Sequence, residues 1–90
     1  MSKLTLFYLN GCPYCRNAKK ALAELAAESP ALPEIEWVEE SEQPGLAGQY
    51  DYYYVPAVFC GKEKLYEAQP GESYADCKAK LKAVLEAARG

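Results

Sequence analysis

The sequence predicts an α/β fold of three layers, with helices on both faces of a four-stranded mixed sheet. Residues 3–9 are apolar on both faces of an extended chain, which is typical of a central strand covered on both sides. Strand-like and helix-like segments follow one another in the order β-α-β-(α)-β-β-α. Ninety residues are too few for two independent cores, so we expect a single domain over residues 1–90.

The first half of the chain is expected to form a parallel β-α-β unit. Asn10-Gly11 predicts a turn after the first strand, and Pro13 suits the first turn of a helix. The prolines at 30 and 33 are expected to end this helix, and residues 35–39 should form the second strand. The buried stripe of the helix should consist of Ala18, Ala21, Leu22, Leu25 and Ala26.

The second half is expected to form a hairpin and a closing helix. Residues 41–50 suggest a short helix with Ser41 as its cap, before a third strand over 57–60. Gly61-Lys62 predicts a two-residue turn into a fourth strand over 63–67. Ser73 should cap a last helix that reaches about residue 88. The buried stripe of this helix should consist of Cys77, Leu81, Val84, Leu85 and Ala88.

Composition and charge exclude several classes of function. With 10 basic and 13 acidic residues the net charge is −3, which disfavours nucleic-acid binding. We find no apolar run that could span a bilayer and no export signal at the N-terminus, so we expect a cytoplasmic monomer. The chain has no histidine, so imidazole is excluded as a catalytic base or a metal ligand.

The four cysteines, at positions 12, 15, 60 and 77, carry the clearest functional signal. Cys12 and Cys15 form a CxxC motif that opens a helix after the first strand, a context typical of redox chemistry. The unpaired N–H groups and the dipole of a helix N-terminus stabilise a thiolate there. We therefore expect Cys12 to attack and Cys15, one turn deeper, to resolve. The alternative is a pair of structural cysteines at helical spacing.

Other residues near the motif could support this chemistry. Arg16 and Lys19 add positive charge within two helical turns, although Lys19 could equally be a solvated helix residue. Pro13 stiffens the turn, and Tyr14 supplies an aromatic surface beside the two sulfurs. The tyrosines 50, 52, 53 and 54 either pack the sheet edge and the short helix or form an aromatic wall that contacts a substrate.

Cys60 and Cys77 carry less information. Cys77 falls on the apolar stripe of the last helix, and Cys60 lies at the end of a strand. A small packed thiol is the default interpretation for each. The alternative is regulatory oxidation or glutathionylation, above all for Cys60 if it is exposed.

The motif Cys12-Pro13-Tyr14-Cys15, with Val55-Pro56 opening a third strand about forty residues later, resembles the dithiol glutaredoxins of the thioredoxin-like superfamily. The resemblance covers nearly the whole chain. It implies that Pro56 is a cis-proline facing the CxxC motif and that backbone groups of Val55 pair with bound glutathione or a substrate peptide. It also implies that Cys12 reduces protein disulfides and glutathione mixed disulfides, with glutathione as co-substrate and disulfide-bearing proteins as partners.

The sequence also differs from that family. Leu9 stands where many glutaredoxins have a lysine, and Tyr54 replaces the threonine of their Thr-Val-Pro pattern. Their Gly-Gly-x-Asp signature, which holds the γ-glutamyl end of glutathione, is missing, and the nearest segment is 68–72. Two of the usual anchors for the charges of glutathione are therefore absent. The alternative is a thioredoxin-like electron carrier that a flavoprotein reductase recharges.

No tightly bound cofactor is expected. The chain has no glycine-rich dinucleotide loop, so its electrons must come from outside rather than from bound NADPH. We also expect no metal. Two metal-binding alternatives remain: a zinc module built on the cysteines, and an iron–sulfur carrier bridged by two chains that each give one cysteine.

Overall fold

A computed structural model describes residues 3–28 and 34–89 of the chain. The elements in chain order are β1 (Leu4–Tyr8), α1 (Pro13–Glu28), β2 (Ile35–Glu39), α2 (Pro44–Ala47), β3 (Ala57–Cys60), β4 (Glu63–Glu67) and α3 (Tyr74–Arg89). This order is the predicted one, and the predicted bounds of the strands hold to within two residues. The prolines at 30 and 33, which the sequence predicts to end the first helix, lie outside the described residues.

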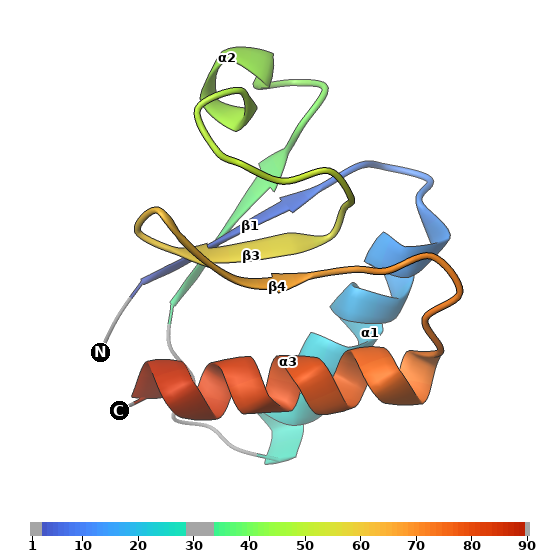
Figure 1. The fold of residues 1–90 in the computed structure, drawn as a ribbon. Helices are drawn as coiled ribbons and strands as arrows, with labels where there is room; N and C mark the ends of the chain where they lie inside the picture. The colour runs from blue at the N-terminus through green and yellow to red at the C-terminus, as the bar shows by residue number, and fades with distance from the viewer. Residues whose placement is uncertain (1–2, 29–33, 90) are drawn as a thin grey trace.

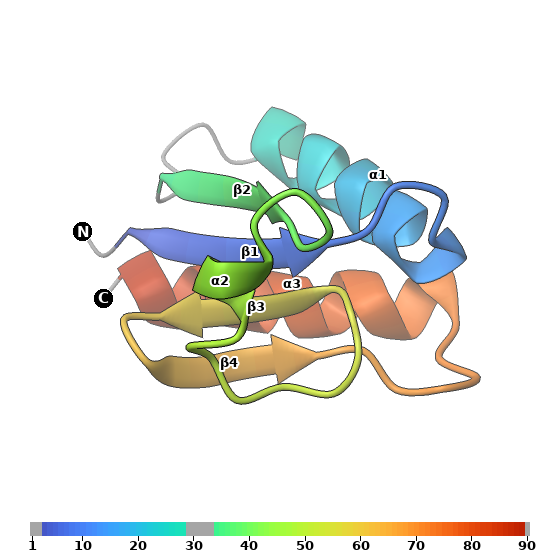
Figure 2. The same cartoon turned by 90° about the horizontal axis from the view of Figure 1, so that it is seen from above.

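The four strands form one mixed sheet in the order β2-β1-β3-β4 (Figure 2). β1 pairs in parallel with β2, with Leu4 opposite Ile35, and antiparallel with β3. β3 and β4 form the predicted hairpin, and Gly61 in its turn has a φ of 62°, a conformation that glycine adopts without strain. The predicted central strand, β1, is therefore an interior strand of the sheet.

The two faces of the sheet are covered very differently (Figure 1). α1 and α3 pack side by side against one face, and we call them the helical layer. α2 and residues 48–56 cover the other face, and we call them the short layer. β1 is buried on both sides, because Leu4 and Leu6 face the helical layer whereas Phe7 faces the short layer. The three-layer α/β prediction is confirmed.

Aromatic side chains complete the short layer, since a helix of four residues covers little of a sheet. The ring of Tyr50 lies 4.7 Å from that of Phe7, and the ring of Tyr52 stacks on Phe7 at 5.1 Å. Both tyrosines also contact the ring of Phe59. Such offset and edge-on contacts add to the free energy gained from burying the rings.

Two details of the predicted helices are wrong. Ala26 is exposed, because the apolar stripe of α1 ends at Leu25. Ser41 does not cap α2, which has Gln43 as its N-cap residue and Pro44 in its first turn. The Ser41 hydroxyl instead donates to the Glu39 carboxylate at 2.7 Å. The short side chain of serine thus turns back to the strand rather than forward to the helix.

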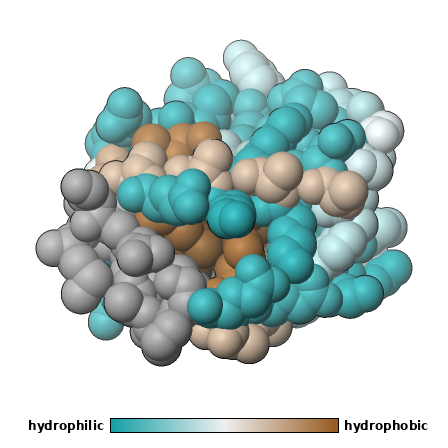
Figure 3. Space-filling model, turned by 90° about the horizontal axis from the view of Figure 1, so that it is seen from below, coloured by the Kyte–Doolittle hydropathy of each residue, from teal (hydrophilic) through white to brown (hydrophobic). Residues whose placement is uncertain are grey.

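The last helix agrees with its prediction. The Asp76 N–H donates to the Ser73 hydroxyl oxygen at 3.1 Å, which is the geometry of an N-cap. All five residues of the predicted stripe are buried against the sheet and α1. On the face that α1 and α3 form, hydrophilic side chains surround a hydrophobic area (Figure 3). In the described part of the chain, each helix is too short or too polar to cross a membrane.

Candidate active site

The two cysteines of the CxxC motif lie where β1 leads into α1. The loop between these elements turns at Gly11, whose φ of 83° favours glycine, and α1 begins at Pro13. The Cys15 N–H donates to the Cys12 sulfur at 3.4 Å. Cys12 is half-buried, whereas Cys15 is buried. An amide at the first turn of a helix therefore faces the more accessible sulfur.

Cys15 sits in the helical layer as a protonated thiol. Burial raises the pKa of Cys15 to about 12, although the Leu9 N–H, which donates to its sulfur at 3.5 Å, and the positive charge of Lys19 both oppose this rise. The thiol of Cys12 contributes to the rise as a neighbour. The two sulfurs therefore differ in access, and the buried Cys15 thiol keeps its proton at neutral pH.

The Val55–Pro56 segment meets Cys12 from the other side of the site. Its peptide bond is cis, as the family resemblance implies. The Cys12 sulfur lies 3.8 Å from the Val55 carbonyl oxygen. Pro56 is buried, and its carbonyl oxygen accepts the Ala68 N–H at 3.0 Å. The start of β3 is thus joined to the residue that follows β4, one residue along the chain from the carbonyl that faces Cys12.

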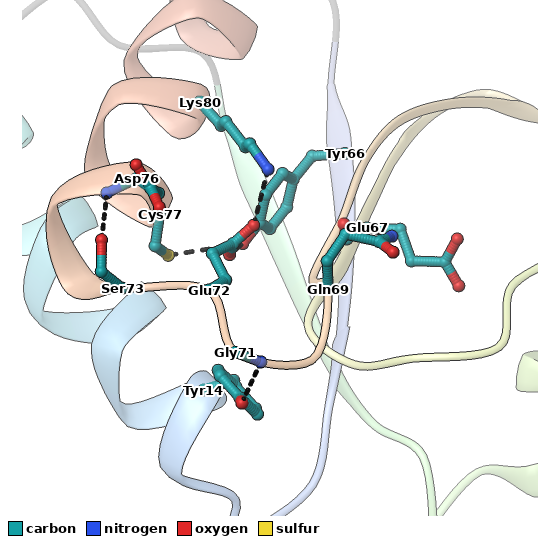
Figure 4. Close-up of polar contacts among 10 residues, drawn as sticks. All are labelled: Tyr14, Tyr66, Glu67, Gln69, Gly71, Glu72, Ser73, Asp76, Cys77 and Lys80. Carbon is teal, nitrogen blue, oxygen red and sulfur yellow. Dashed lines mark hydrogen bonds and ion pairs between the residues drawn. The ribbon is translucent and has the colours of Figure 1, made fainter.

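A groove of about 180 Å³ opens in this region, lined by Tyr14, Tyr54, Val55, Ala68, Gln69 and Pro70. This volume is below the ~300–1,000 Å³ of typical small-molecule pockets. Among the residues that the structure describes, none that lines the groove is charged. The Gly71 N–H donates to the Tyr14 hydroxyl at 2.8 Å, which ties the CxxC helix to one wall of the groove (Figure 4).

Three sequence-predicted residues, Tyr14, Tyr54 and Val55, thus meet around one groove, and others do not. Arg16 and Pro13 are exposed at the start of α1. The Lys19 ammonium lies 4.6 Å from the centre of the Tyr8 ring, so it packs on the helical layer. The packing interpretation of the tyrosine run holds for part of it. Tyr50 and Tyr52 pack in the core, whereas 84% of Tyr53 and 49% of Tyr54 are exposed.

A buried carboxylate that the sequence analysis missed holds the loop before Cys12. Glu39 ends β2 and is only 6% exposed. Its carboxylate accepts the Asn10 N–H at 3.0 Å and the Ser41 N–H at 2.6 Å. The Ser41 hydroxyl and the Asn10 N–H hold the pKa of Glu39 below its usual value, so it is charged at neutral pH. Its sequence signal is weak, because a glutamate at a strand end is normally solvated.

A second polar cluster, also missed, joins the end of β4 to the start of α3 and lies above Gly71 and Tyr14 in Figure 4. The Glu72 side chain is 2% exposed, accepts a hydrogen bond from the Tyr66 hydroxyl and pairs with the Lys80 ammonium at 2.8 Å. The Tyr66 hydroxyl also lies 3.4 Å from the Cys77 sulfur. Burial raises the pKa of Cys77, which is a packed thiol as the default interpretation holds. Cys60 is half-buried at the end of β3.

The cysteines do not gather into a metal site in the described part of the chain. Among residues 3–28 and 34–89, no three cysteine, aspartate or glutamate side chains lie close enough together to hold one ion.

Comparison with known proteins supports the fold. No family model matches the chain. A thioredoxin from Methanocaldococcus jannaschii is 36% identical over 56 residues, which is 62% of this chain and 66% of that protein, just under two thirds of its length. A mutant thioredoxin from Halobacterium salinarum superposes with a TM-score of 0.64 at 22% identity, over 94% of this chain and 72% of that one. Thioredoxin 1 from Thermosipho africanus superposes with a TM-score of 0.61 at 18% identity, over 98% of this chain and 99% of that one. The chain has a thioredoxin-like fold.

Proposed function

We propose that this thioredoxin-like chain is a thiol–disulfide oxidoreductase in which Cys12 is the nucleophile and Cys15 the resolving thiol. One observation carries the proposal: the half-buried Cys12 sulfur accepts the Cys15 N–H at the start of α1, with the buried Cys15 thiol one turn deeper. Cys12 is thus the more accessible sulfur and receives a helix N–H, whereas Cys15 is buried, which is the difference that dithiol exchange needs.

The exchange proceeds in two balanced steps. The Cys12 thiolate attacks one sulfur of a substrate disulfide, so a mixed disulfide forms and the other substrate sulfur leaves as a thiolate. Cys15 then loses its proton and attacks the Cys12 sulfur. The mixed disulfide breaks, the second substrate thiolate takes up a proton, and the two electrons given to the substrate leave a Cys12–Cys15 disulfide.

Substrate recognition is assigned to the groove beside Cys12. Its walls of tyrosine, valine, alanine and proline suit an apolar side chain next to the substrate cysteine. The backbone groups of Val55 would pair with the substrate main chain. Protein disulfides are therefore the favoured substrates. This chemistry fits a compartment rich in thiol reductants, in agreement with the cytoplasmic location expected from the sequence.

The electron donor is a separate question, with glutathione and a flavoprotein reductase as the two candidates. Glutathione carries one ammonium and two carboxylates, which need charged or hydrogen-bonding partners when bound. The described residues that line the groove offer no charged side chain. The one carboxylate of segment 68–72 belongs to Glu72, which is buried and already paired with Lys80 and Tyr66. These contacts favour the flavoprotein reductase over the glutathione that the family resemblance implies.

NADPH consumption with a protein disulfide as substrate tests both the exchange chemistry and the electron donor. One reaction contains glutathione and glutathione reductase, and the other contains thioredoxin reductase. We expect turnover in the second reaction and little in the first. The reverse result would make the protein a glutaredoxin in function despite its groove. Cys12→Ser should abolish turnover in either reaction, and retained activity would refute the mechanism.

A further inference from the structure

We infer that Glu67 is a positioning residue that joins the two walls of the groove beside Cys12 and thereby controls the binding of protein substrates. The inference rests on the proposed function, because it assigns the groove to the substrate chain. It concerns a residue that does not line the groove.

The contacts of Glu67 connect two segments that are distant in the sequence. One carboxylate oxygen accepts the N–H of Tyr53 at 2.5 Å and the N–H of Tyr54 at 2.8 Å. Glu67 itself is the last residue of β4 and is followed directly by Ala68. Tyr54 and Val55 form one wall of the groove, and Ala68 to Pro70 form the other. The Glu67 carboxylate therefore binds the segment that forms the first wall, while its own backbone leads directly into the second wall.

The surroundings of Glu67 keep this carboxylate charged and oriented. Its side chain is only 11% exposed, and its second oxygen pairs with the Lys64 ammonium at 2.8 Å. Burial alone would raise the pKa of Glu67, but Lys64 and the two N–H groups more than offset it, so the pKa lies below its usual value. In Figure 4 the Glu67 side chain points away from the Tyr66–Glu72 cluster. Its role is thus independent of that cluster.

The segment that Glu67 holds, Tyr53 and Tyr54, has little side-chain packing to fix its position. Tyr53 and Tyr54 are the most exposed of the large hydrophobic residues in the described chain, so packing contributes little there. Yet the next residue, Val55, presents the carbonyl oxygen that faces Cys12 at 3.8 Å. Two hydrogen bonds to a charged acceptor are stronger than ordinary backbone contacts. A segment ordered before binding loses less entropy when a substrate chain lies along it.

The test compares Glu67→Ala with Glu63→Ala, a matched control. Glu63 is an exposed glutamate of the same strand, so its loss changes the charge equally. Dithiothreitol supplies the electrons for insulin reduction, whereas the reduced protein, freed of dithiothreitol, reacts with the small disulfide in a single turnover, so both assays are independent of the natural donor. Insulin is the protein disulfide, and 5,5′-dithiobis(2-nitrobenzoate) is a small disulfide that needs no groove. Amide hydrogen exchange of Tyr53 and Tyr54, followed by NMR, reports the hydrogen bonds directly.

We expect Glu67→Ala to raise the KM for insulin about tenfold or more with little change in kcat, since each of the two lost charge-assisted hydrogen bonds is worth roughly that factor. The rate with the small disulfide should stay at the wild-type value, and the amides of Tyr53 and Tyr54 should lose their protection. Glu63→Ala should match the wild type throughout. Glu67→Gln keeps an oxygen acceptor, so it should recover most of the affinity for insulin. It also provides the comparison if Glu67→Ala does not fold.

Two results would overturn the inference. In the first, the Glu67 variants reduce insulin like the wild type, so the contact does not serve binding. In the second, both substrates slow equally, so Glu67 supports the fold or Cys12 rather than the groove. A wild-type protein that reduces neither disulfide would instead refute the proposed function, and the inference would fall with it.

Discussion

The helical layer and the short layer cover the two faces of one sheet by different means. The helical layer consists of two 16-residue helices whose apolar stripes repeat along their length. The short layer consists of a four-residue helix, two core tyrosines and a loop whose backbone N–H groups donate to the Glu67 carboxylate. Cys15 belongs to the first layer, and Cys12 faces the Val55 end of the second. The CxxC motif thus lies at one end of the helical layer, where the Val55 end of the short layer meets it.

The largest expected contrast lies between the two sulfurs. Because the pKa of Cys15 is raised to about 12, its thiolate fraction at pH 8 should be about a thousandfold below that of an ordinary thiol. Iodoacetamide should therefore modify Cys12 and spare Cys15 at this pH, as peptide mass spectrometry after short labelling would show. Equal labelling of both residues would contradict the assignment of Cys15 to the buried layer.

The same pKa shift predicts a loss of stability in alkaline solution. A thiol with a raised pKa holds its proton more tightly in the folded state, so its contribution is complete below the unfolded value of about 9. As the pH rises from about 9 to 12, the free energy of unfolding should fall. Cys15→Ala should reduce the slope of this fall in urea titrations. An unchanged slope would mean that Cys15 ionises normally.

Leu81→Ala should destabilise the packing of the helical layer. Leu81 lies in the middle of α3 and is fully buried against the sheet. Removing its side chain should cost about 2–5 kcal/mol of unfolding free energy, while the rate per folded molecule with a small disulfide stays unchanged. Urea unfolding and the disulfide assay at low temperature measure the two effects. A selective loss of rate without loss of stability would contradict the division of roles.

Glu39→Gln should affect the loop before Cys12 with a smaller loss of stability than Leu81→Ala. The substitution removes the charge that the Asn10 N–H and Ser41 contacts stabilise. Since the pKa of Glu39 is lowered by folding, its contribution is present above about pH 4.5 and disappears as the pH falls through the folded value. In urea unfolding, the variant should therefore lose stability at pH 7 and differ less from the wild type at pH 3. An equal loss at both pH values would show that the charge is not what holds the loop.

The difference between the layers also explains what could be predicted from the sequence. Strands and long helices carry a periodic apolar pattern, so the sheet, the stripe of α3 and the Ser73 cap are all predictable. The CxxC motif is likewise predictable, because its spacing and its place at a helix start are both local features of the sequence. By contrast, Glu39 and Glu67 act through backbone N–H groups of distant residues, and a backbone donor leaves no trace in the sequence. Ser41 is predicted with the wrong partner for a different reason, because its hydroxyl donates to the nearby Glu39 carboxylate instead of capping α2.

Trapping of the mixed disulfide tests the central claim most directly. A Cys15→Ser variant keeps Cys12 at the start of α1 but cannot complete the second step of the exchange. After brief incubation with a protein disulfide, intact-mass and peptide mass spectrometry should find one covalent adduct per chain, on Cys12 alone. An adduct on Cys60 or Cys77 in place of Cys12, or no adduct at all, would contradict the account.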